Sequence, residues 1–360
     1  MSEKCIVIAA AGTGGHVMPG IAVAKVLQSR GWRLHWVGTT TGMERGLVEK
    51  QAIDFDALNF QGVRGKGLLG AVKGGVKLLA AFFQARSILK RLRPKAVFST
   101  GGYIAVPVGW AAKTLGIPLV LMNCDADLLM STNTLLPISK ALACGFAGGA
   151  RSFAGSKGVV TGNPVRESIL AIPPVQERWA GREGVLKLFV FGGSLGAKVI
   201  NDVLPEALAL IPEASRPMVV HQTGKNRDDE VRAHYERLGV KADVRPFIDD
   251  MAHEYSQCDV VLSRSGATSV SELCAAGVPA ILVPFVAKTT SHQRGNARYM
   301  QSQGAAIVVE QSDFTPEYVK TLLSGLTREK LSEMATRARE LAKPKAAEEV
   351  ANLVEKWANI

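Results

Sequence analysis

Residues 258–296 read CDVVLSRSGATSVSELCAAGVPAILVPFVAKTTSHQRGN, and this stretch decides the fold. It predicts a buried strand over 259–262, a helix over 267–276 and a second buried strand over 280–285. This order is typical of an α/β fold with parallel strands, in which ligands bind outside the carboxyl ends of the strands. The small polar turn over 263–268 occupies that place.

The polar residues of the stretch allow two interpretations. The segment 269–272, Ser-Val-Ser-Glu, matches a capping box, in which a serine caps a helix and a glutamate returns to it. Gln293 and Asn296 are spaced so that both amides can face one point from the start of a helix. A carboxylate at Glu272 for ribose hydroxyls and paired amides for sugar hydroxyls favour a nucleotide-sugar site.

With these residues the chain resembles the MurG family, the transferases that add N-acetylglucosamine (GlcNAc) from its UDP sugar to the lipid-linked muramyl peptide of cell-wall synthesis. The likeness extends over nearly the whole chain. The residues that carry it here are Arg264, Ser265, Gly266, Ala267, Thr268, Ser269, Val270, Ser271, Glu272, the run 275–280, Gln293, Asn296 and Ala297. The resemblance implies an α/β fold of the GT-B type, with two facing doubly wound Rossmann-like domains and a cleft between them.

An internal repeat also indicates two similar domains. Residues 96–121 share a strand, turn and helix pattern with residues 260–282, and residues 186–196 repeat the strand and glycine turn of residues 5–16. The Gly and Pro of 161–164 suggest the boundary between the halves. We expect residues 1–164 to form an acceptor- and membrane-associated domain, which the resemblance completes with a C-terminal helix over 344–360. Residues 165–343 are expected to bind UDP-GlcNAc.

The charge of the chain indicates which kind of molecule it binds, and its cysteine content indicates the cellular compartment in which it works. Residues 1–166 hold 20 Lys and Arg against 7 Asp and Glu, a net charge of +13 in a chain of +11. This excess favours a polyphosphate or an anionic membrane; nucleic acid is disfavoured because no nucleic-acid-binding signature is present. Five cysteines without C-x-x-C spacing predict a reduced, cytoplasmic protein. No apolar run reaches the roughly 20 residues that a transmembrane helix needs.

The amino end predicts a strand over 5–11, a glycine turn over 12–16 and a helix from Pro19 to Arg30. The turn does not match the dinucleotide fingerprint, because Val17 stands where the third glycine belongs. It therefore either holds a phosphate or permits close packing of helix on strand.

The family pattern Gly-Thr-Gly-Gly-His falls on this turn and implies that Thr13, Gly14 and Gly15 contact substrate. His16 is the candidate base, since an imidazole with a pKa of about 6.5 suits proton removal near neutral pH. Asp125 and Asp127 are its competitors, because they are the only acidic residues between Ala57 and Arg166.

The departing diphosphate can be stabilised by oriented N–H groups of glycine turns and helix starts. The turn 192–196, with the Ser194 hydroxyl, is the main candidate, joined by the turn 263–268. Because the sequence has no D-x-D motif and no His/Cys cluster, we predict neither a metal nor a cofactor.

The resemblance assigns further roles in donor binding. It implies that Arg166 pairs with the diphosphate or orients the nucleotide, that the backbone of Ile248 reads uracil, and that Gln293 contacts the donor sugar. Six consecutive residues are assigned to the nucleotide: Ala267, Thr268, Ser269, Val270, Ser271 and Glu272. The chain departs from the family at 122–125, Met-Asn-Cys-Asp, where Asp125 replaces the donor-contacting Asn.

The segment 67–94 predicts a basic amphipathic helix, with an apolar stripe of Leu69, Val72, Val76, Leu79 and Phe83. Such a helix can lie on an anionic bilayer or pack on its sheet with a solvated basic face. Both can hold at once if Leu68, Leu69 and Phe82 are exposed.

The sequence thus predicts an inverting transferase that moves GlcNAc from UDP-GlcNAc to undecaprenyl-diphosphoryl-muramyl-pentapeptide (lipid I), giving lipid II. It would act as a peripheral protein at the cytoplasmic face of the bacterial inner membrane. Other cell-wall synthesis proteins are possible partners. Two alternatives remain: another GT-B nucleotide-sugar enzyme such as an epimerase, and a non-catalytic UDP-sugar-binding protein at the membrane.

Overall fold

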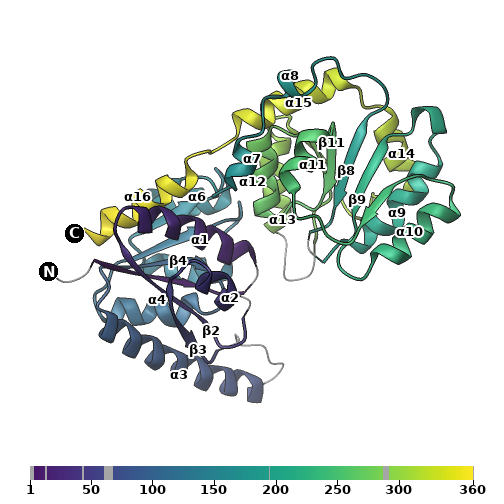
Figure 1. Ribbon diagram of the computed structural model, residues 1–360. Coiled ribbons are helices and arrows are strands. Elements are labelled where there is room, and N and C mark those ends of the chain that lie inside the picture. Colours follow the sequence, from purple (N-terminus) through teal and green to yellow (C-terminus); the bar gives the residue numbers. More distant parts are fainter. Residues whose placement is uncertain are drawn as a thin grey trace. The chain divides into compact units, whose positions relative to one another are not determined.

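The computed structural model describes residues 4–12, 14–42, 44–60, 68–193, 195–286 and 292–359. The chain forms two compact units (Figure 1). Unit 1 comprises residues 1–164 and 345–360, and unit 2 comprises residues 165–344. Each unit contains one parallel sheet with helices on both faces, which confirms the predicted α/β class with two Rossmann-like domains.

The sheet of unit 1 has seven parallel strands within the described ranges. In spatial order they are β3 (Asp54–Leu58), β2 (Arg33–Thr39), β1 (Cys5–Ala10), β4 (Ala96–Gly101), β5 (Leu119–Asn123), β6 (Ala141–Cys144) and β7 (Gly158–Val160). The strand order reverses between β1 and β4, and ligands bind at such a switch point in open α/β sheets.

The helices of unit 1 cover both faces of this sheet. In Figure 1, α3 and α4 lie on one face, and α1 and α16 lie on the other. The helices are α1 (Gly14–Ser29), α2 (Glu44–Glu49), α3 (Leu68–Leu92), α4 (Ala105–Thr114), α5 (Met130–Leu135), α6 (Gly149–Ala154) and α16 (Ala346–Ala358). Helix α16 is tied to the unit through Glu355, whose Oε1 accepts a hydrogen bond from Trp32 Nε1 at 2.7 Å.

The sheet of unit 2 has six parallel strands in the part of the chain that the structure describes. Their spatial order is β10 (Asp243–Arg245), β9 (Met218–Gln222), β8 (Lys187–Phe191), β11 (Val260–Ser263), β12 (Ala280–Leu282) and β13 (Ala306–Val308). The switch point of this sheet lies between β8 and β11, whose last residues, Phe191 and Ser263, are paired, so that the turns after both strands leave the same edge of the sheet.

The helices of unit 2 also form two layers. In Figure 1, α9, α10 and α14 lie on one side of the sheet, and α11, α12 and α15 lie on the other. The helices are α7 (Glu167–Leu170), α8 (Val175–Arg178), α9 (Lys198–Ala209), α10 (Asp228–Arg237), α11 (Met251–Gln257), α12 (Ala267–Ala276), α13 (His292–Gln301), α14 (Pro316–Ser324) and α15 (Arg328–Glu340).

Two predicted element boundaries are wrong. Helix α1 begins at Gly14 and contains Pro19 in its interior, whereas the sequence predicted Pro19 as the first helical residue. Proline is favoured at a helix start because its missing N–H is unpaired there in any case, but one missing bond inside a packed helix can be tolerated. As a result His16 lies in the first turn of α1. Strand β12 ends at Leu282, earlier than predicted.

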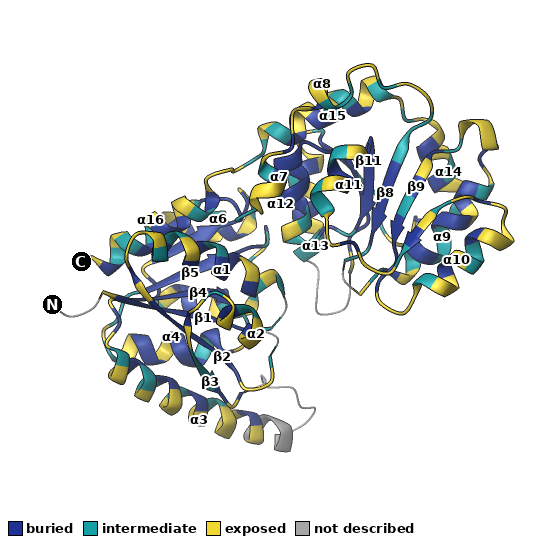
Figure 2. Ribbon diagram, in the orientation of Figure 1, coloured by how far each residue is buried: buried dark blue, intermediate teal, exposed yellow. Residues whose placement is uncertain are grey.

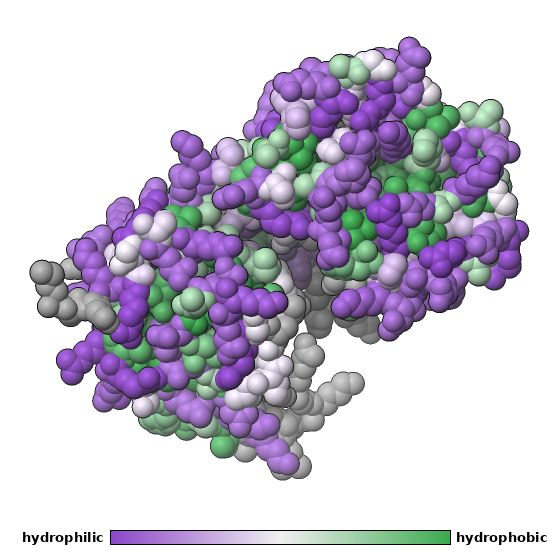
Figure 3. All heavy atoms as spheres, viewed as in Figure 1, coloured by the Kyte–Doolittle hydropathy of each residue, from purple (hydrophilic) through white to green (hydrophobic). Residues whose placement is uncertain are grey.

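Helix α3 turns a different set of side chains to its sheet than the sequence suggested. Its exposed apolar residues are Val76, Leu79 and Phe83, which are 65%, 56% and 60% exposed. Phe82, whose exposure was the condition for the helix to contact sheet and membrane at once, packs against the core. Figure 2 shows the resulting exposed side of α3, and Figure 3 shows apolar residues reaching the surface where α3 runs. The side chains of Leu68, Leu69 and Val72 lie outside the described residues.

No helix within the described ranges is both long and apolar enough to span a membrane. The five cysteines are buried and free of disulfide bonds.

Helix α1 approaches its sheet closely at Gly20, and this contact sets the position of His16 at the start of the same helix. A Cβ atom on Gly20 would lie 2.7 Å from Cη2 of the buried Trp36, closer than two carbon atoms can pack. Trp36 cannot readily yield, because its Nε1 donates to the Ala10 carbonyl at 3.0 Å. The indole therefore sets how near the helix can come.

We expect Gly20→Ala to lower the free energy of unfolding by about 1–3 kcal/mol, the usual cost of overpacking. Gly75→Ala in α3 is the matched control, because nothing lies within 4 Å of its added Cβ. The control should raise stability by up to about 1 kcal/mol, since alanine favours helices over glycine. Thermal unfolding measures both variants, and equal shifts in Tm would contradict the packing argument.

Candidate functional site

The turn after β11 leads into α12 without a side-chain cap. Gly266 is the N-cap residue, and no side chain accepts a hydrogen bond from the helix start there. Ser269 lies inside the first turn, and the Glu272 carboxylate is bound elsewhere, so the capping-box interpretation is wrong. The remaining α12 residues differ in exposure: Thr268 is exposed, Ala267, Ser269 and Ser271 are half-buried, and Val270 is fully buried.

Glu272 is held by two partners from other elements. Its Oε1 accepts a hydrogen bond from Arg166 Nε at 3.0 Å and forms an ion pair with Arg166 Nη2 at 2.9 Å, and its Oε2 accepts a hydrogen bond from the Tyr255 hydroxyl at 3.3 Å. The Glu272 side chain is only 7% exposed. Burial raises the pKa of this carboxyl, and the Arg166 guanidinium opposes the rise. The structure thus brings two predicted donor residues, Arg166 and Glu272, into one ion pair.

The amides of Gln293 and Asn296 bind two different backbone groups. Gln293 Oε1 accepts from the Phe285 N–H at 2.9 Å, whereas Asn296 Nδ2 donates to the Ser265 carbonyl at 3.0 Å. Asn296 is fully buried. In the protein without ligand, Asn296 thus holds the turn after β11, while Gln293 holds the backbone at Phe285. The sequence spacing could not distinguish these cases, because one helical turn contains both positions.

The glycine turn after β8 is built from closely approaching backbone. Gly196 N–H donates to the Gly193 carbonyl at 3.0 Å, and Gly196 has a positive φ of 73°. A Cβ on Gly196 would lie 1.9 Å from the Thr223 carbonyl oxygen, so only glycine fits. Helix α9 starts directly after the turn, and N–H groups at such a helix start can bind phosphate. Ser194 lies outside the described residues.

Behind this turn lies a buried polar network that sequence reasoning missed. Asn201 Nδ2 donates to the Thr223 carbonyl at 3.0 Å, so its Oδ1 accepts from His221 Nε2 at 3.2 Å. His221 Nδ1 is then the acceptor for the Tyr235 hydroxyl at 3.0 Å. These hydrogen bonds link Tyr235, His221 and Asn201 in series and hold the Thr223 carbonyl against the glycine turn. A histidine inside a strand pattern was the only sequence signal.

Gln222 joins the glycine turn to Ile248, and the sequence analysis missed it as well. Its Nε2 donates to the Gly193 carbonyl at 3.2 Å, and its Oε1 accepts from the Ile248 N–H at 2.9 Å. The Ile248 side chain is buried. The backbone segment expected to read uracil is therefore fixed to the turn expected to hold diphosphate.

In unit 1, His16 is fixed by the end of β4. His16 Nδ1 lies 2.9 Å from the Thr100 carbonyl oxygen, and Thr100 Oγ1 donates to the His16 carbonyl at 2.7 Å. Because a carbonyl only accepts, the neutral imidazole carries its proton on Nδ1 and its lone pair on Nε2. That tautomer is the one a general base needs. Gly14 is half-buried and Gly15 exposed beside it, and Thr13 lies outside the described residues.

The segment after β5 is organised by the fully buried Asn123. Its Nδ2 donates to the carbonyls of Asp125 at 2.7 Å and Asp127 at 2.9 Å, and its Oδ1 accepts from the Leu129 N–H at 3.0 Å. Asp125 is half-buried and Asp127 exposed at this carboxyl edge. Asp125, where the chain departs from the family pattern, therefore lies in a turn whose backbone is held by the Asn123 side chain.

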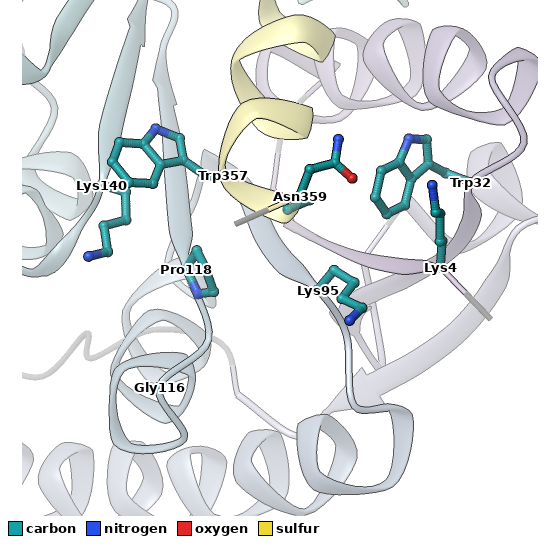
Figure 4. A pocket seen from close by; sticks show the side chains of 9 residues that line it. Lys4, Trp32, Lys95, Gly116, Pro118, Lys140, Trp357 and Asn359 are labelled. Atoms are coloured by element: carbon teal, nitrogen blue, oxygen red, sulfur yellow. The ribbon is translucent and has the colours of Figure 1, made fainter. Parts of the chain in front are cut away.

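A cavity of about 500 Å³ lies at the opposite edge of the unit 1 sheet (Figure 4). It is lined by Trp32, Trp357 and three lysines that precede strands: Lys4, Lys95 and Lys140. The ends of α4 and α16 meet this cavity, and lysines stabilise the partial negative charge of helix C-termini. None of the predicted site residues lines it. Among the described residues, no group of three or more His, Cys, Asp or Glu could hold a metal ion.

Two models of one protein family match the chain. The glycosyltransferase family 28 N-terminal domain matches residues 6–142, and the glycosyltransferase family 28 C-terminal domain matches residues 187–353. A protein of Chromobacterium violaceum is 49% identical over 360 residues, and one of Janthinobacterium sp. (strain Marseille) is 47% identical over 357 residues; each match covers 99% of both chains. Both relatives are named UDP-N-acetylglucosamine–N-acetylmuramyl-(pentapeptide) pyrophosphoryl-undecaprenol N-acetylglucosamine transferase.

The crystal structure of Acinetobacter baumannii MurG superposes with a TM-score of 0.84 at 35% identity, covering 98% of this chain and 99% of that chain. This chain belongs to the MurG family. The resemblance inferred from sequence is confirmed, and the MurG family match extends over both units. A UDP-GlcNAc 2-epimerase from Neisseria meningitidis, bound to UDP-GlcNAc, superposes with a TM-score of 0.68 at 15% identity, which shows a shared fold alone.

The buried network of unit 2 predicts a specific pH dependence of stability. Burial lowers the pKa of His221 to about 3. In the unfolded chain its pKa is about 6.5, so between these values the unfolded state binds a proton that the folded state does not. The free energy of unfolding should therefore fall by about 1.4 kcal/mol per pH unit below 6.5 through this residue.

His221→Gln should flatten the decline in stability on the acid side, as measured by urea unfolding from neutral to acidic pH. His253→Gln is the matched control, because His253 is exposed on α11. An unchanged slope in His221→Gln would show that the buried imidazole does not resist protonation.

Proposed function

We propose that this protein transfers GlcNAc from UDP-GlcNAc to the muramyl-pentapeptide of lipid I, giving lipid II in peptidoglycan synthesis. The observation that carries this proposal is the near-full-length identity of 47–49% to relatives named for that reaction. The local geometry supports it, because both units carry polar turns at the carboxyl edges of parallel sheets.

The proposed reaction is a single displacement with inversion. An acceptor hydroxyl attacks the anomeric carbon of GlcNAc, its proton passes to Nε2 of His16, and the bond from the sugar to the diphosphate breaks as UDP leaves. The Thr100 carbonyl supports this role, because it holds the proton on Nδ1 and orients the ring. The N–H groups of the glycine turn after β8 and of the α9 start would stabilise charge on the departing diphosphate.

The donor is assigned to unit 2. Glu272 would accept hydrogen bonds from ribose hydroxyls, Arg166 would pair with the diphosphate, and the Ile248 backbone would read uracil. Gln293 would contact the sugar, with its amide oriented by the Phe285 N–H. Asn296 is proposed only to support the neighbouring turn.

Acceptor-dependent UDP release tests the function directly. UDP-GlcNAc and a soluble lipid I analogue should together yield UDP and the disaccharide product. UDP-GlcNAc binding without acceptor-dependent release would favour the non-catalytic alternative, and a changed sugar without acceptor would favour an epimerase.

His16→Ala should lower kcat by about 10²–10⁴-fold, the usual contribution of a general base, with little change in the Kd of UDP-GlcNAc. The donor affinity should persist because its proposed ligands lie in unit 2. His253→Gln serves as the control for histidine removal. Full turnover in His16→Ala would transfer the role of base to another residue, with Asp125 the next to test.

We also propose that the protein acts peripherally at the cytoplasmic face of the bacterial inner membrane. The supporting feature is the exposed face of α3, where Val76, Leu79 and Phe83 stand among the exposed Lys73 and Lys77. Apolar side chains can enter the head-group region while lysines contact anionic lipid, at roughly 1 kcal/mol for each lysine. A lipid-linked acceptor would be reached there.

Leu79→Asp combined with Phe83→Asp should weaken binding to vesicles that contain anionic phospholipid by at least about tenfold. The reason is that two negative charges replace apolar side chains that would be buried in the head-group region on binding. Leu210→Asp is the control, since Leu210 is 49% exposed on unit 2. Vesicle cosedimentation measures both. Equal binding of the two variants would exclude this face of α3 as the membrane contact.

A further inference from the structure

Both oxygens of the Glu272 carboxylate are engaged by protein side chains before any ligand is present. Oε1 lies against the Arg166 guanidinium, with a hydrogen bond from Nε at 3.0 Å and an ion-pair contact from Nη2 at 2.9 Å, and Oε2 accepts a hydrogen bond from the Tyr255 hydroxyl. A ribose carries two vicinal hydroxyls, and both would donate to this carboxylate in the proposed function. Because two nitrogens of Arg166 lie within 3.0 Å of Oε1, a ribose hydroxyl that approaches this oxygen competes with the guanidinium.

Tyr255 is the partner that cannot leave. It is fully buried, and its ring packs edge-on against Phe189 at 5.9 Å and Phe191 at 6.2 Å between ring centroids. Burial raises the pKa of its hydroxyl well above the usual value, so the hydroxyl keeps its proton and remains a donor. Moving this ring would open a cavity in the core of unit 2.

Arg166 is the partner that can leave. Its side chain is 45% exposed, against 7% for Glu272, so the guanidinium can exchange the carboxylate for another anion without a large loss of packing. It is also the N-cap residue of α7, a helix of only four residues. Its extended backbone conformation, with φ of −61° and ψ of 139°, therefore places it at the end of a helix and not within one.

We propose that Glu272 is shared between a fixed and an exchangeable partner: Tyr255 positions Oε2 permanently, and Arg166 releases Oε1 to the ribose hydroxyls as its guanidinium moves to the diphosphate. This proposal rests on the proposed donor site. It assigns to Tyr255 a positioning role that the sequence did not indicate. It also makes ribose binding and diphosphate binding interdependent, because the same guanidinium that vacates the carboxylate neutralises the phosphates.

The exchange explains how the buried Glu272 carboxylate stays ionised in the free protein and can still accept hydrogen bonds from a neutral ribose. In the free protein the guanidinium offsets the desolvation that raises the pKa of Glu272. A nucleoside without phosphates offers Arg166 no new partner, so the ribose must compete with the ion pair. A nucleoside diphosphate supplies that partner and removes the competition.

Binding of uridine and of UDP to Arg166→Gln is the deciding experiment, measured by calorimetry at alkaline pH so that the carboxylate is ionised. We expect the affinity for UDP to fall by at least about tenfold, the loss of a hydrogen-bonded charge. The affinity for uridine should stay constant or rise, because the competing guanidinium is gone. A parallel loss of both affinities would show that Arg166 only supports the site, and would overturn the exchange.

Arg232→Gln is the matched control, because Arg232 on α10 is 44% exposed and pairs with Asp229. Neither affinity should change in this variant. A second readout is the pH profile: a protonated carboxyl is a poorer acceptor, so uridine binding is lost as the pH falls. Without the guanidinium the pKa of Glu272 rises, and this loss should move to higher pH in Arg166→Gln.

Tyr255→Phe tests the fixed partner through a substrate with one hydroxyl fewer. Wild-type protein should bind 2′-deoxy-UDP-GlcNAc roughly tenfold more weakly than UDP-GlcNAc. In Tyr255→Phe the KM for UDP-GlcNAc should rise several-fold at similar kcat, and the penalty for the deoxy donor should shrink. An undiminished penalty would remove Tyr255 from the proposal. Tyr318→Phe, at an exposed tyrosine on α14, is the control.

Two further results separate the exchange from the donor site on which it rests. If Glu272→Gln binds uridine and UDP as the wild type does, the carboxylate does not contact ribose, and both proposals about Glu272 fail. If Glu272→Gln weakens uridine binding while Arg166→Gln weakens both ligands equally, the ribose contact stands and the exchange fails. Should Tyr255→Phe not fold, as judged by its thermal unfolding, the Arg166 comparison still decides the exchange.

Discussion

Loops that leave the carboxyl ends of parallel strands carry backbone groups that the sheet no longer pairs, and here buried amide side chains pair them. Asn123 serves the loop after β5, Asn201 the loop after β9, and Asn296 the turn after β11. A buried carbonyl or N–H group without a partner costs about 1–3 kcal/mol, so these amides keep the loops in one conformation. The candidate site consists largely of such loops.

This rigid backbone lets a few side chains be positioned from distant parts of the sequence. The bond from His16 to the Thr100 carbonyl spans 84 residues, and the bond from Arg166 to Glu272 spans 106 residues. Neither pair lies on one helix or in one loop. His16, at the start of α1, is held in one tautomer by the Thr100 carbonyl of β4. Arg166, at the start of α7, holds the Glu272 carboxylate of α12 in place.

Much of the architecture could be predicted because it follows from local periodicity. Apolar runs that end in glycine or small polar turns indicated the strands, and α12 forms at its predicted bounds. Predictions from local patterns failed where one short sequence pattern is compatible with more than one local structure. The segment 269–272 matches a capping box, but the Glu272 carboxylate contacts Arg166 and Tyr255, and α12 starts at Gly266 without a side-chain cap. Likewise Pro19 fits a helix start, yet packing of α1 carries the helix through it.

The sequence by itself determined the α/β class, the repeat of one strand and helix pattern, the family, and which polar residues follow which strands. These properties depend on the order of residues along the chain and on periodicities of two to four residues. Only the tertiary structure decided the partners: Tyr255 and Arg166 on one carboxylate, Asn296 on a backbone carbonyl, and His221 in a buried network. Hydrogen bonds form between groups that the packing of helices on a sheet brings within about 3 Å, and no spacing along the chain encodes that distance.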